Sequence, residues 1–333
     1  MARPGPLNSL CDVAGLTVGC AEDAAALTGV TVIVPENRAV CAVDVRGGGP
    51  GTRETDVLAM ETLADAIDAL VLSGGSVYGL AAADGVTALM GAEGKGFGLV
   101  ALPGVPRSPI VPGAVLYDLA NGGNKAWGDS PPYNALARQA YAARAERVPL
   151  GNAGAGMGAT AGALKGGQGS ASVVSADGYT VAALACVNCF GSVTMPGSRA
   201  FWVWPYEVAG EFGGVRPEAN VTAESENWDG AKLNPEPHAN TTLVCVATDA
   251  ALTRADAKRV AQMASAGVAR AIRPVFAPFD GDVVFALSTA AKPLSEPKPL
   301  ARARIGAMAA DCVARAIARG VYEAAVVGVH KAW

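Results

Sequence analysis

A long polar segment of this sequence runs directly into an uninterrupted strand pattern. Residues 205–240 are rich in Pro, Gly, Asn and Glu, carry seven acidic and two basic residues, and show little periodicity. The run that follows, Thr241-Thr-Leu-Val-Cys-Val-Ala-Thr, predicts a buried strand. Loops of this length inside a compact domain are uncommon and tend to be functional, disordered or processed. The junction of Asn240 and Thr241 is therefore the first candidate for a functional position.

The rest of the chain alternates strand and helix patterns, which indicates an α/β protein. Residues 29–35 and 39–45 predict one strand hairpin, and residues 169–175 and 179–190 predict a second. Helical spacing predicts further helices, the last at about 300–319. The chain has 333 residues, of which 51% are hydrophobic and 17% charged, so it can bury a large core.

Charge and composition exclude several classes of partner. A formal net charge of -4 offers no basic face, so neither nucleic acid nor an anionic membrane surface is expected as a partner, and a small neutral substrate fits better. The first residues contain no apolar signal core, and the uncharged run 179–198 contains turn formers, which favour a buried strand over a membrane span. Seven scattered cysteines suit a reducing cytoplasm.

No motif predicts a metal or a cofactor. Cys186 and Cys189 form a single CxxC without a second pair or nearby histidines, so buried strand cysteines are the simpler interpretation. The glycine-rich segment 151–169 matches neither a dinucleotide nor a phosphate-binding pattern. Ser76 misses the GxSxG nucleophile pattern by one position and is predicted instead to cap a helix.

Only two histidines occur, which favours a nucleophile that does not depend on imidazole. One such nucleophile is an N-terminal threonine, whose own α-amino group has a pKa of about 7.7 to 8.0 and can serve as the general base. Thr241 would acquire that amine if the Asn240-Thr241 bond were cut. The simpler alternative is a strand that begins with Thr after an Asn turn residue.

Six ordered motifs extend the argument over nearly the whole chain. They are Ala42-Val-Asp-Val-Arg-Gly-Gly, Ser73-Gly-Gly-Ser-Val-Tyr-Gly-Leu-Ala-Ala-Ala-Asp-Gly-Val, Gly113-Ala-Val-Leu-Tyr-Asp, Gly154-Ala-Gly-Met-Gly-Ala-Thr-Ala-Gly-Ala-Leu-Lys, Asn240-Thr-Thr and Phe279-Asp-Gly-Asp. Through them the sequence resembles the self-processing L-aminopeptidase/D-esterase family, and within it the nylon-oligomer (6-aminohexanoate-oligomer) endo-hydrolases. The Asn-Thr junction favours that branch, because aminopeptidase members tend to have Gly-Ser there.

The resemblance implies an α/β/β/α sandwich of the N-terminal-nucleophile-hydrolase type, with two stacked sheets covered by helices. It implies one domain over residues 1–333, cleaved into pieces of 1–240 and 241–333. It also implies a homo-oligomer, expected here to be a tetramer of processed units. No cofactor is implied.

The same resemblance assigns the site. Thr241 matches the nucleophile and Asn240 the residue before the scissile bond, while Asp280 and Asp282 match an acidic pair at the processing site. Three further residues fall on active-site positions: Tyr117, Lys165 and Asn188. The interval between Lys165 and Asn188 is shorter than in the nylon hydrolases, and Gly166 and Gly167 follow the lysine, so this departure bears on Lys165. Asp280 and Asp282 could alternatively belong to a β-turn before a strand.

Chemistry gives each residue a role. Asn188 can donate amide hydrogens to an oxyanion, and Lys165 can lower the pKa of the new amine by repulsion between like charges or relay a proton. Tyr117 can donate to the substrate or position Thr241, and the acidic pair can orient the threonine. The predicted enzyme hydrolyses short linear amides, either nylon oligomers or the N-termini of peptides and β-peptides. An acyltransferase and an unprocessed, non-catalytic α/β scaffold are the alternatives.

Overall fold

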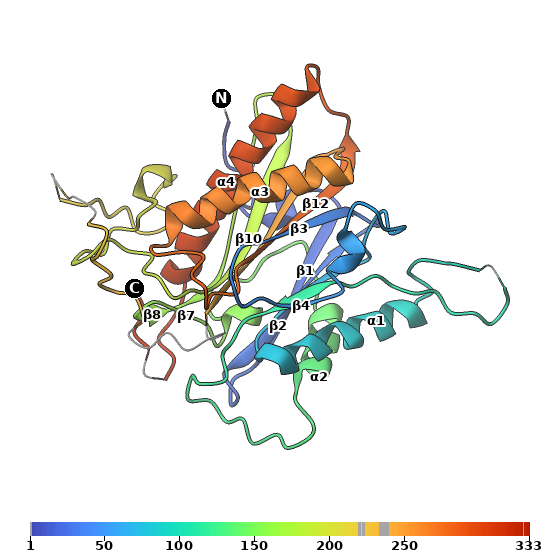
Figure 1. Cartoon of the computed structure of the whole chain (residues 1–333), viewed down its shortest axis with the longest axis horizontal. Coiled ribbons are helices and arrows are strands. Elements are labelled where there is room, and N and C mark those ends of the chain that lie inside the picture. Colours follow the sequence, from blue (N-terminus) through green and yellow to red (C-terminus); the bar gives the residue numbers. More distant parts are fainter. Residues whose placement is uncertain (1, 101, 219–220, 222–223, 233–239, 329) are drawn as a thin grey trace.

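Two five-stranded sheets form the centre of the molecule in the computed structural model (Figure 1). The structure describes residues 2–100, 102–218, 221, 224–232, 240–328 and 330–333. In the first sheet the strands lie in the order β1 (Leu16–Asp23), β2 (Thr28–Pro35), β5 (Leu70–Ser73), β6 (Gly113–Val115), β4 (Gly51–Arg53). In the second sheet the order is β3 (Val40–Val45), β12 (Val283–Lys292), β11 (Thr241–Ala250), β10 (Thr180–Asn188), β9 (Gly167–Val174).

The strand that begins at Thr241 is central in the second sheet and buried on both faces. Leu243 and Cys245 of β11 lie in the apolar layer between the two sheets. Val244 and Val246 lie in the layer between this sheet and the helices outside it. Because successive side chains of a strand point to opposite faces, burial on both sides requires an uninterrupted apolar run. The sequence pattern of this strand therefore follows from its place between two cores.

Helices cover the outer face of each sheet (Figure 1). The second sheet packs against α3 (Arg254–Ala271) and α4 (Lys298–Tyr322), and the first packs against α1 (Ala82–Ala92) and α2 (Tyr133–Ala142). Thr253 caps α3, since its hydroxyl accepts from the amide of Asp256. The layers run helix, sheet, sheet, helix, which confirms the predicted sandwich.

The glycine-rich segment serves close backbone packing. A Cβ on Gly169 in β9 would lie 2.0 Å from the carbonyl oxygen of Ala316 in α4, and one on Gly167 would lie 2.3 Å from that of Gly320. Short elements precede β9 in this segment, namely the 3-10 turn Gly154–Gly156 and the strand pair β7 (Thr160–Ala161) and β8 (Leu164–Lys165). Glycine is needed here because strand and helix backbones approach too closely for a side chain.

Several sequence predictions on the N-terminal half are wrong in detail. The predicted hairpin of residues 29–35 and 39–45 does not form, because β2 pairs with β1 and β5, whereas β3 pairs with β12 in the other sheet. Helical spacing in the sequence also predicts a helix over residues 61–69, but these residues form turns and an isolated bridge. The hairpin of β9 and β10 is confirmed. Its second strand, β10, occupies the first half of the uncharged run 179–198 that was considered as a membrane span.

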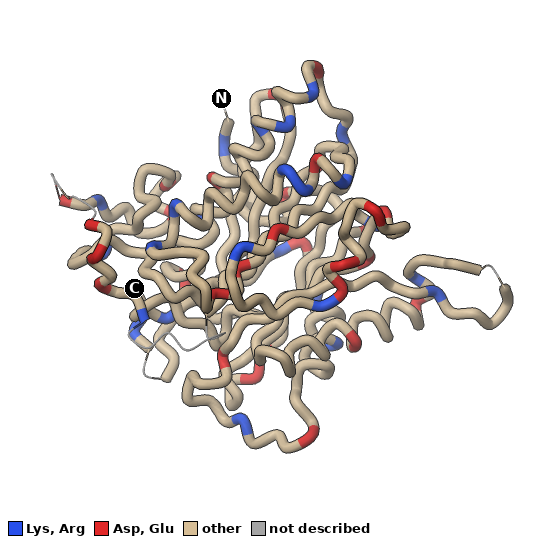
Figure 2. The backbone as a smooth tube through the Cα atoms, in the orientation of Figure 1, with Lys and Arg blue, Asp and Glu red and all other residues tan. Residues whose placement is uncertain are grey.

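The polar segment contributes one short 3-10 turn, Trp204–Tyr206, and otherwise no regular structure among its described residues. Acidic and basic positions are interspersed over much of the described backbone (Figure 2). Within the described ranges, no helix combines the length and the apolar character that crossing a bilayer requires. The last residue of the polar segment, Asn240, directly precedes β11 and forms a parallel bridge with Asp280.

Candidate active site

Thr241 lies at the point where three strands of the second sheet begin or end. It is the first residue of β11 and pairs with Asn188, the last residue of β10. On its other side, Asn240 forms a parallel bridge with Asp280 just before β12. Thr241 is 3% exposed. The fold thus brings together residues that are far apart in the sequence around one buried threonine.

The Thr241 hydroxyl contacts the peptide group that precedes it. Its Oγ1 donates to the carbonyl oxygen of Asn240 at 2.5 Å. That carbonyl oxygen also accepts from the backbone amide of Gly281 at 2.7 Å. A Cβ on Gly281 would lie 2.5 Å from the threonine Oγ1, so the backbone can approach only because this residue is glycine. Hydroxyl and candidate scissile carbonyl are therefore held side by side.

The Asn188 side chain is oriented by a network of contacts. Its Oδ1 accepts from the amide of Thr160 at 2.9 Å and from the ammonium of Lys232 at 3.5 Å. Its Nδ2 donates to the carbonyl oxygen of Tyr117 at 2.9 Å. These partners determine which end of the amide carries the donors. The donor end points across from the second sheet toward the segment that follows β6 in the first.

Asp280 and Asp282 are both 2% exposed and lie close together. Asp280 accepts from the amide of Ala277 at 2.9 Å through Oδ2, while its Oδ1 has no hydrogen-bond partner among the described residues. Asp282 accepts from the amide of Thr242 at 2.6 Å. Burial raises the pKa of both carboxyls, and the neighbouring charge of Asp280 helps to raise the pKa of Asp282 to about 7. Near neutral pH the pair can therefore hold a proton.

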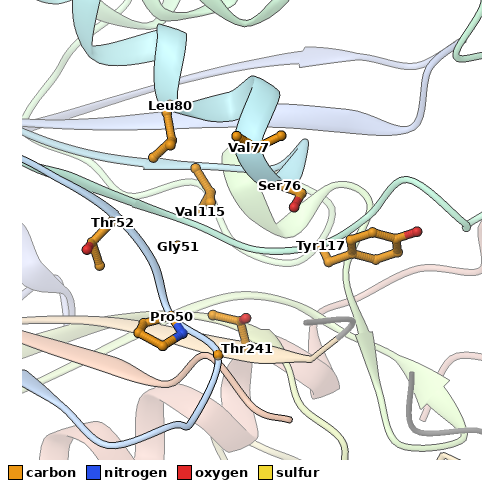
Figure 3. A pocket seen from close by; sticks show the side chains of 10 residues that line it. Pro50, Gly51, Thr52, Ser76, Val77, Leu80, Val115, Tyr117 and Thr241 are labelled. Carbon is orange, nitrogen blue, oxygen red and sulfur yellow. The ribbon is translucent and has the colours of Figure 1, made fainter. Parts of the chain in front are cut away.

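A cavity of about 580 Å³ opens in front of Thr241. Its walls come from the Gly49–Thr52 segment, from the turn after β5 and from the strand region of β6 (Figure 3). The side chains of Val77, Leu80 and Val115 make much of the wall apolar. None of the described residues that line it carries a carboxylate. The cavity is large enough for several linear backbone units and offers mainly aliphatic contact.

Tyr117 and Lys165 stand in different relations to Thr241. Tyr117 lines the cavity, but its phenol oxygen points away from Thr241 (Figure 3). Lys165 is 1% exposed, and its ammonium donates to the carbonyl oxygens of Gly156 at 3.0 Å and Gly166 at 2.6 Å. Burial lowers the pKa of Lys165 to about 7 against the opposing charge of Asp118. No described contact joins Lys165 to Thr241, so their relation runs through the β7–β8 pair and Asn188.

Sequence reasoning missed three residues of this region. Ser76 does not cap a helix with its side chain: it begins the 3-10 helix Ser76–Ala81 with a φ of 51° and lines the cavity. Such a conformation is strained for serine and is typical of functional sites. Gly281 lies under Thr241, and Lys232 lies beside Asn188. Lys232 lies in the polar segment, and no pattern in the neighbouring sequence indicates that it belongs to a functional site.

Two stacked sheets between two layers of helices are the fold of the N-terminal-nucleophile hydrolases. Among solved structures, a Burkholderia sp. β-aminopeptidase matches with a TM-score of 0.69 at 24% identity, covering 96% of this chain and 88% of that one. The L-aminopeptidase D-Ala-esterase/amidase of Ochrobactrum anthropi, described as a variant of this fold, matches with a TM-score of 0.67 at 22% identity, covering 97% and 88%.

The chain belongs to peptidase family S58, whose model matches residues 8–332. An uncharacterized aminopeptidase of Mycobacterium tuberculosis (strain ATCC 25618 / H37Rv) is 41% identical over 96% of this chain and 94% of its own length. A 6-aminohexanoate-oligomer endohydrolase of Kocuria sp. (strain KY2) is 29% identical over 84% and 74%. The predicted family is thereby confirmed, and membership supports a peptide-bond hydrolase.

Proposed function

We propose that this chain is a self-processing amide hydrolase in which Thr241 is the nucleophile, first of its own cleavage and then of substrate hydrolysis. The observation that carries the proposal is the contact between the Thr241 hydroxyl and the carbonyl of Asn240. A nucleophile beside the carbonyl it attacks needs little reorganisation, and orientation of this kind supplies a large part of a rate enhancement.

In the cleavage step, Oγ1 of Thr241 attacks the carbonyl carbon of Asn240. The bond between that carbon and the Thr241 nitrogen breaks, the nitrogen takes a proton, and an ester remains. The amide of Gly281, already 2.7 Å from the Asn240 carbonyl oxygen, stabilises the charge that develops there. Water then hydrolyses the ester and leaves a carboxylate on Asn240 and a free amine on Thr241. The products are the pieces 1–240 and 241–333.

In the mature enzyme the new amine acts as the general base for its own hydroxyl. Asn188 donates to the substrate oxyanion, and Tyr117 contacts the substrate. Lys165 and the Asp280–Asp282 pair set the charge around the threonine. These steps use groups of the chain and water alone. The described residues contain no group of three or more metal-ligating side chains.

The proposed substrates are short linear amides. The apolar walls of the cavity suit aliphatic chains such as those of 6-aminohexanoate oligomers. Similarity to proteins named as aminopeptidases supports peptides or β-peptides as the alternative within this class. An N-terminal ammonium would need an anionic partner, and the described residues of the cavity wall do not provide one. This favours amides whose ammonium, where they carry one, lies several chain atoms from the scissile bond, as the five methylenes of a 6-aminohexanoate unit allow.

The deciding experiment compares the parent chain with a Thr241→Ala variant. On a denaturing gel the parent is expected to give pieces of 240 and 93 (333 − 240) residues, while the variant stays intact and hydrolyses no amide. Thr241→Ser is the matched variant, since it keeps a hydroxyl and is expected to cleave. An intact parent chain that nevertheless hydrolyses amides would exclude this mechanism, and an intact, inactive parent would favour the scaffold. Product formed on adding an amine acceptor would identify an acyltransferase.

Assembly and location belong to the same proposal. A loop between α1 and β6 carries the exposed aliphatic residues Leu99, Val100, Leu102 and Val105 and projects from the body (Figure 1). An exposed apolar group of this kind supports association, proposed as a tetramer of processed units. A sedimenting mass near 33.4 kDa would contradict it. All seven cysteines are free, which supports a reducing, cytoplasmic location.

A further inference from the structure

A second, smaller cavity of about 140 Å³ lies on the other side of Tyr117. Tyr117 lines both cavities, so the second one adjoins the space in front of Thr241. Its described lining includes Thr160, Lys232 and His330, and no described lining residue is acidic. The larger cavity is apolar and the smaller one is basic.

Among the described residues, the ammonium of Lys232 has only two long contacts. Its contacts are with the backbone oxygen of Asn188 at 3.4 Å and with Oδ1 of the same residue at 3.5 Å. Charged N–H donors normally lie about 2.7 to 2.9 Å from their acceptors, and an ammonium has three of them. The charges of Asp280 and Asp282 act to raise the pKa of Lys232, but no ion pair of Lys232 occurs among the described residues. Desolvation nevertheless lowers the pKa of Lys232 to about 8, so most molecules carry the charge at neutral pH.

Two further polar side chains at or near the cavity are already engaged. Asn121 donates to the carbonyl oxygens of Leu27 and Gly158. Asp118, below Gly158, accepts from the hydroxyl of Thr28 and the amide of Gly75. The ring nitrogens of His330 have no described hydrogen-bond partner, and burial together with the charges of Lys165 and Lys232 lowers its pKa. Among the described lining residues, Lys232, His330 and the phenol of Tyr117 therefore remain as donors for a ligand.

We propose that the cavity lined by Tyr117, Lys232 and His330 binds a carboxylate of the amide substrate, with the Lys232 ammonium as the charged partner. This rests on the proposed function and names its substrate class. The substrate is a short linear amide that spans both cavities, with its scissile bond at Thr241 and a free carboxylate beyond Tyr117. A carboxylate can accept two short, charged hydrogen bonds, and no described residue accepts such a bond from Lys232.

Binding can be tested without cleavage or catalysis, because the intact chain already contains the cavity. In a Thr241→Ala background, calorimetry compares N-hexanoyl-6-aminohexanoate with its primary carboxamide. We expect the carboxylate to bind about tenfold more tightly, and a further Lys232→Gln change to abolish the difference. Lys95→Gln, a partly exposed lysine paired with Glu93, is the control for removing one positive charge.

Two results would overturn the inference. Equal affinity for acid and carboxamide in the Thr241→Ala chain would show that the cavity does not recognise the charge. Equal loss of affinity for both ligands on Lys232→Gln would show that Lys232 only supports the site. Cleaved parent protein, compared through its KM for the same two amides, distinguishes the source of the carboxylate: loss of the preference there would assign the cavity to the new C-terminus at Asn240 and overturn the assignment to substrate. Failure of cleavage alone bears on the proposed function and leaves the binding result standing.

Discussion

The two sheets make different contributions to the candidate active site. The second sheet supplies Thr241, Asn188 and the Asp280–Asp282 pair from the ends of long strands, β10 and β11 being 9 and 10 residues long. The first sheet supplies the cavity wall from short strands, β5 and β6 being 4 and 3 residues long, and from the turns after them. Groups on long, doubly buried strands are held more accurately than groups on turns. The difference predicts that the second sheet controls reaction rates and the first controls substrate preference.

Asn188→Ala tests the second sheet most strongly. Removing an oxyanion donor typically lowers kcat by about 10²- to 10³-fold, and that loss is expected for hydrolysis of a short amide, measured by product release. Thr160→Val is the matched control, because it removes only the 3.3 Å contact of the Thr160 hydroxyl and leaves the backbone donor to Asn188 in place. If both variants lose activity equally, Asn188 acts by holding the loop and not as a donor.

Gly281→Ala tests the placement of the threonine hydroxyl. The added Cβ would lie 2.5 Å from Oγ1 of Thr241, so the hydroxyl must move. A displacement of about 1 Å can cost about 10²-fold in rate, which is the slowing expected for self-cleavage followed on a denaturing gel. Gly91→Ala is the control, since a Cβ there makes only ordinary contacts. Cleavage at the parent rate would show that the observed hydroxyl position is not the reactive one.

The sequence predicted the second sheet far better than the first. Its strands within residues 241–248 and 179–190 could be predicted, because burial on both faces leaves an unbroken apolar pattern in the sequence. The pairing of β2 was predicted wrongly because proximity in sequence favours a hairpin, whereas β2 and β3 belong to different sheets. Which strands share a sheet is decided by contacts between distant residues, which a local pattern does not contain.

The same limit applied to the site. Thr241 and the acidic pair lay in motifs that the resemblance could align, and the same resemblance assigned Asn188 outside those motifs. Lys232 was missed because a lysine in a polar segment has the same local pattern whether it faces solvent or the site. The sequence predicted that Ser76 lies at the start of a helix, which is close to its observed position. Its positive φ could not be predicted, because it depends on the tertiary contacts of the turn after β5. Whether Lys165 acts on Thr241 stays a prediction.

Asp282→Asn tests the buried charge of the second sheet through pH. The folded state raises the pKa of Asp282 to about 7, above the unfolded value of about 3.9, so the folded chain binds the proton more tightly. Stability attributable to this group is therefore present below about pH 4 and is lost as pH rises toward 7. Urea unfolding compares Asp282→Asn with its parent, both in the Thr241→Ala background. As pH rises across that window, the free energy of unfolding of Asp282→Asn should increase by more than about 1.4 kcal/mol relative to that of the parent.

Asp129→Asn, at an exposed position, controls for the loss of one negative charge. Stability curves of Asp282→Asn and its parent that stay parallel from about pH 4 to about pH 8 would mean that the carboxyl is not protonated by folding. In that case the Asp280–Asp282 pair would have to hold two charges, and the neighbouring Lys232 would be their most direct source of compensation.

Leu80→Ala tests the first sheet, where the smallest effect is expected. Leu80 contributes aliphatic surface to the cavity and lies on the 3-10 helix after β5. Each substrate methylene that is no longer buried against this side chain costs about 0.8 kcal/mol, or about fourfold, which should appear as a higher KM for an uncharged acyl chain. Both kcat and the rate of self-cleavage should stay at the parent values, because no group of the second sheet moves. Leu63→Ala, 87% exposed, serves as the control. A fall in the self-cleavage rate of Leu80→Ala would contradict the separate roles of the two sheets, because the cavity wall would then also position Thr241.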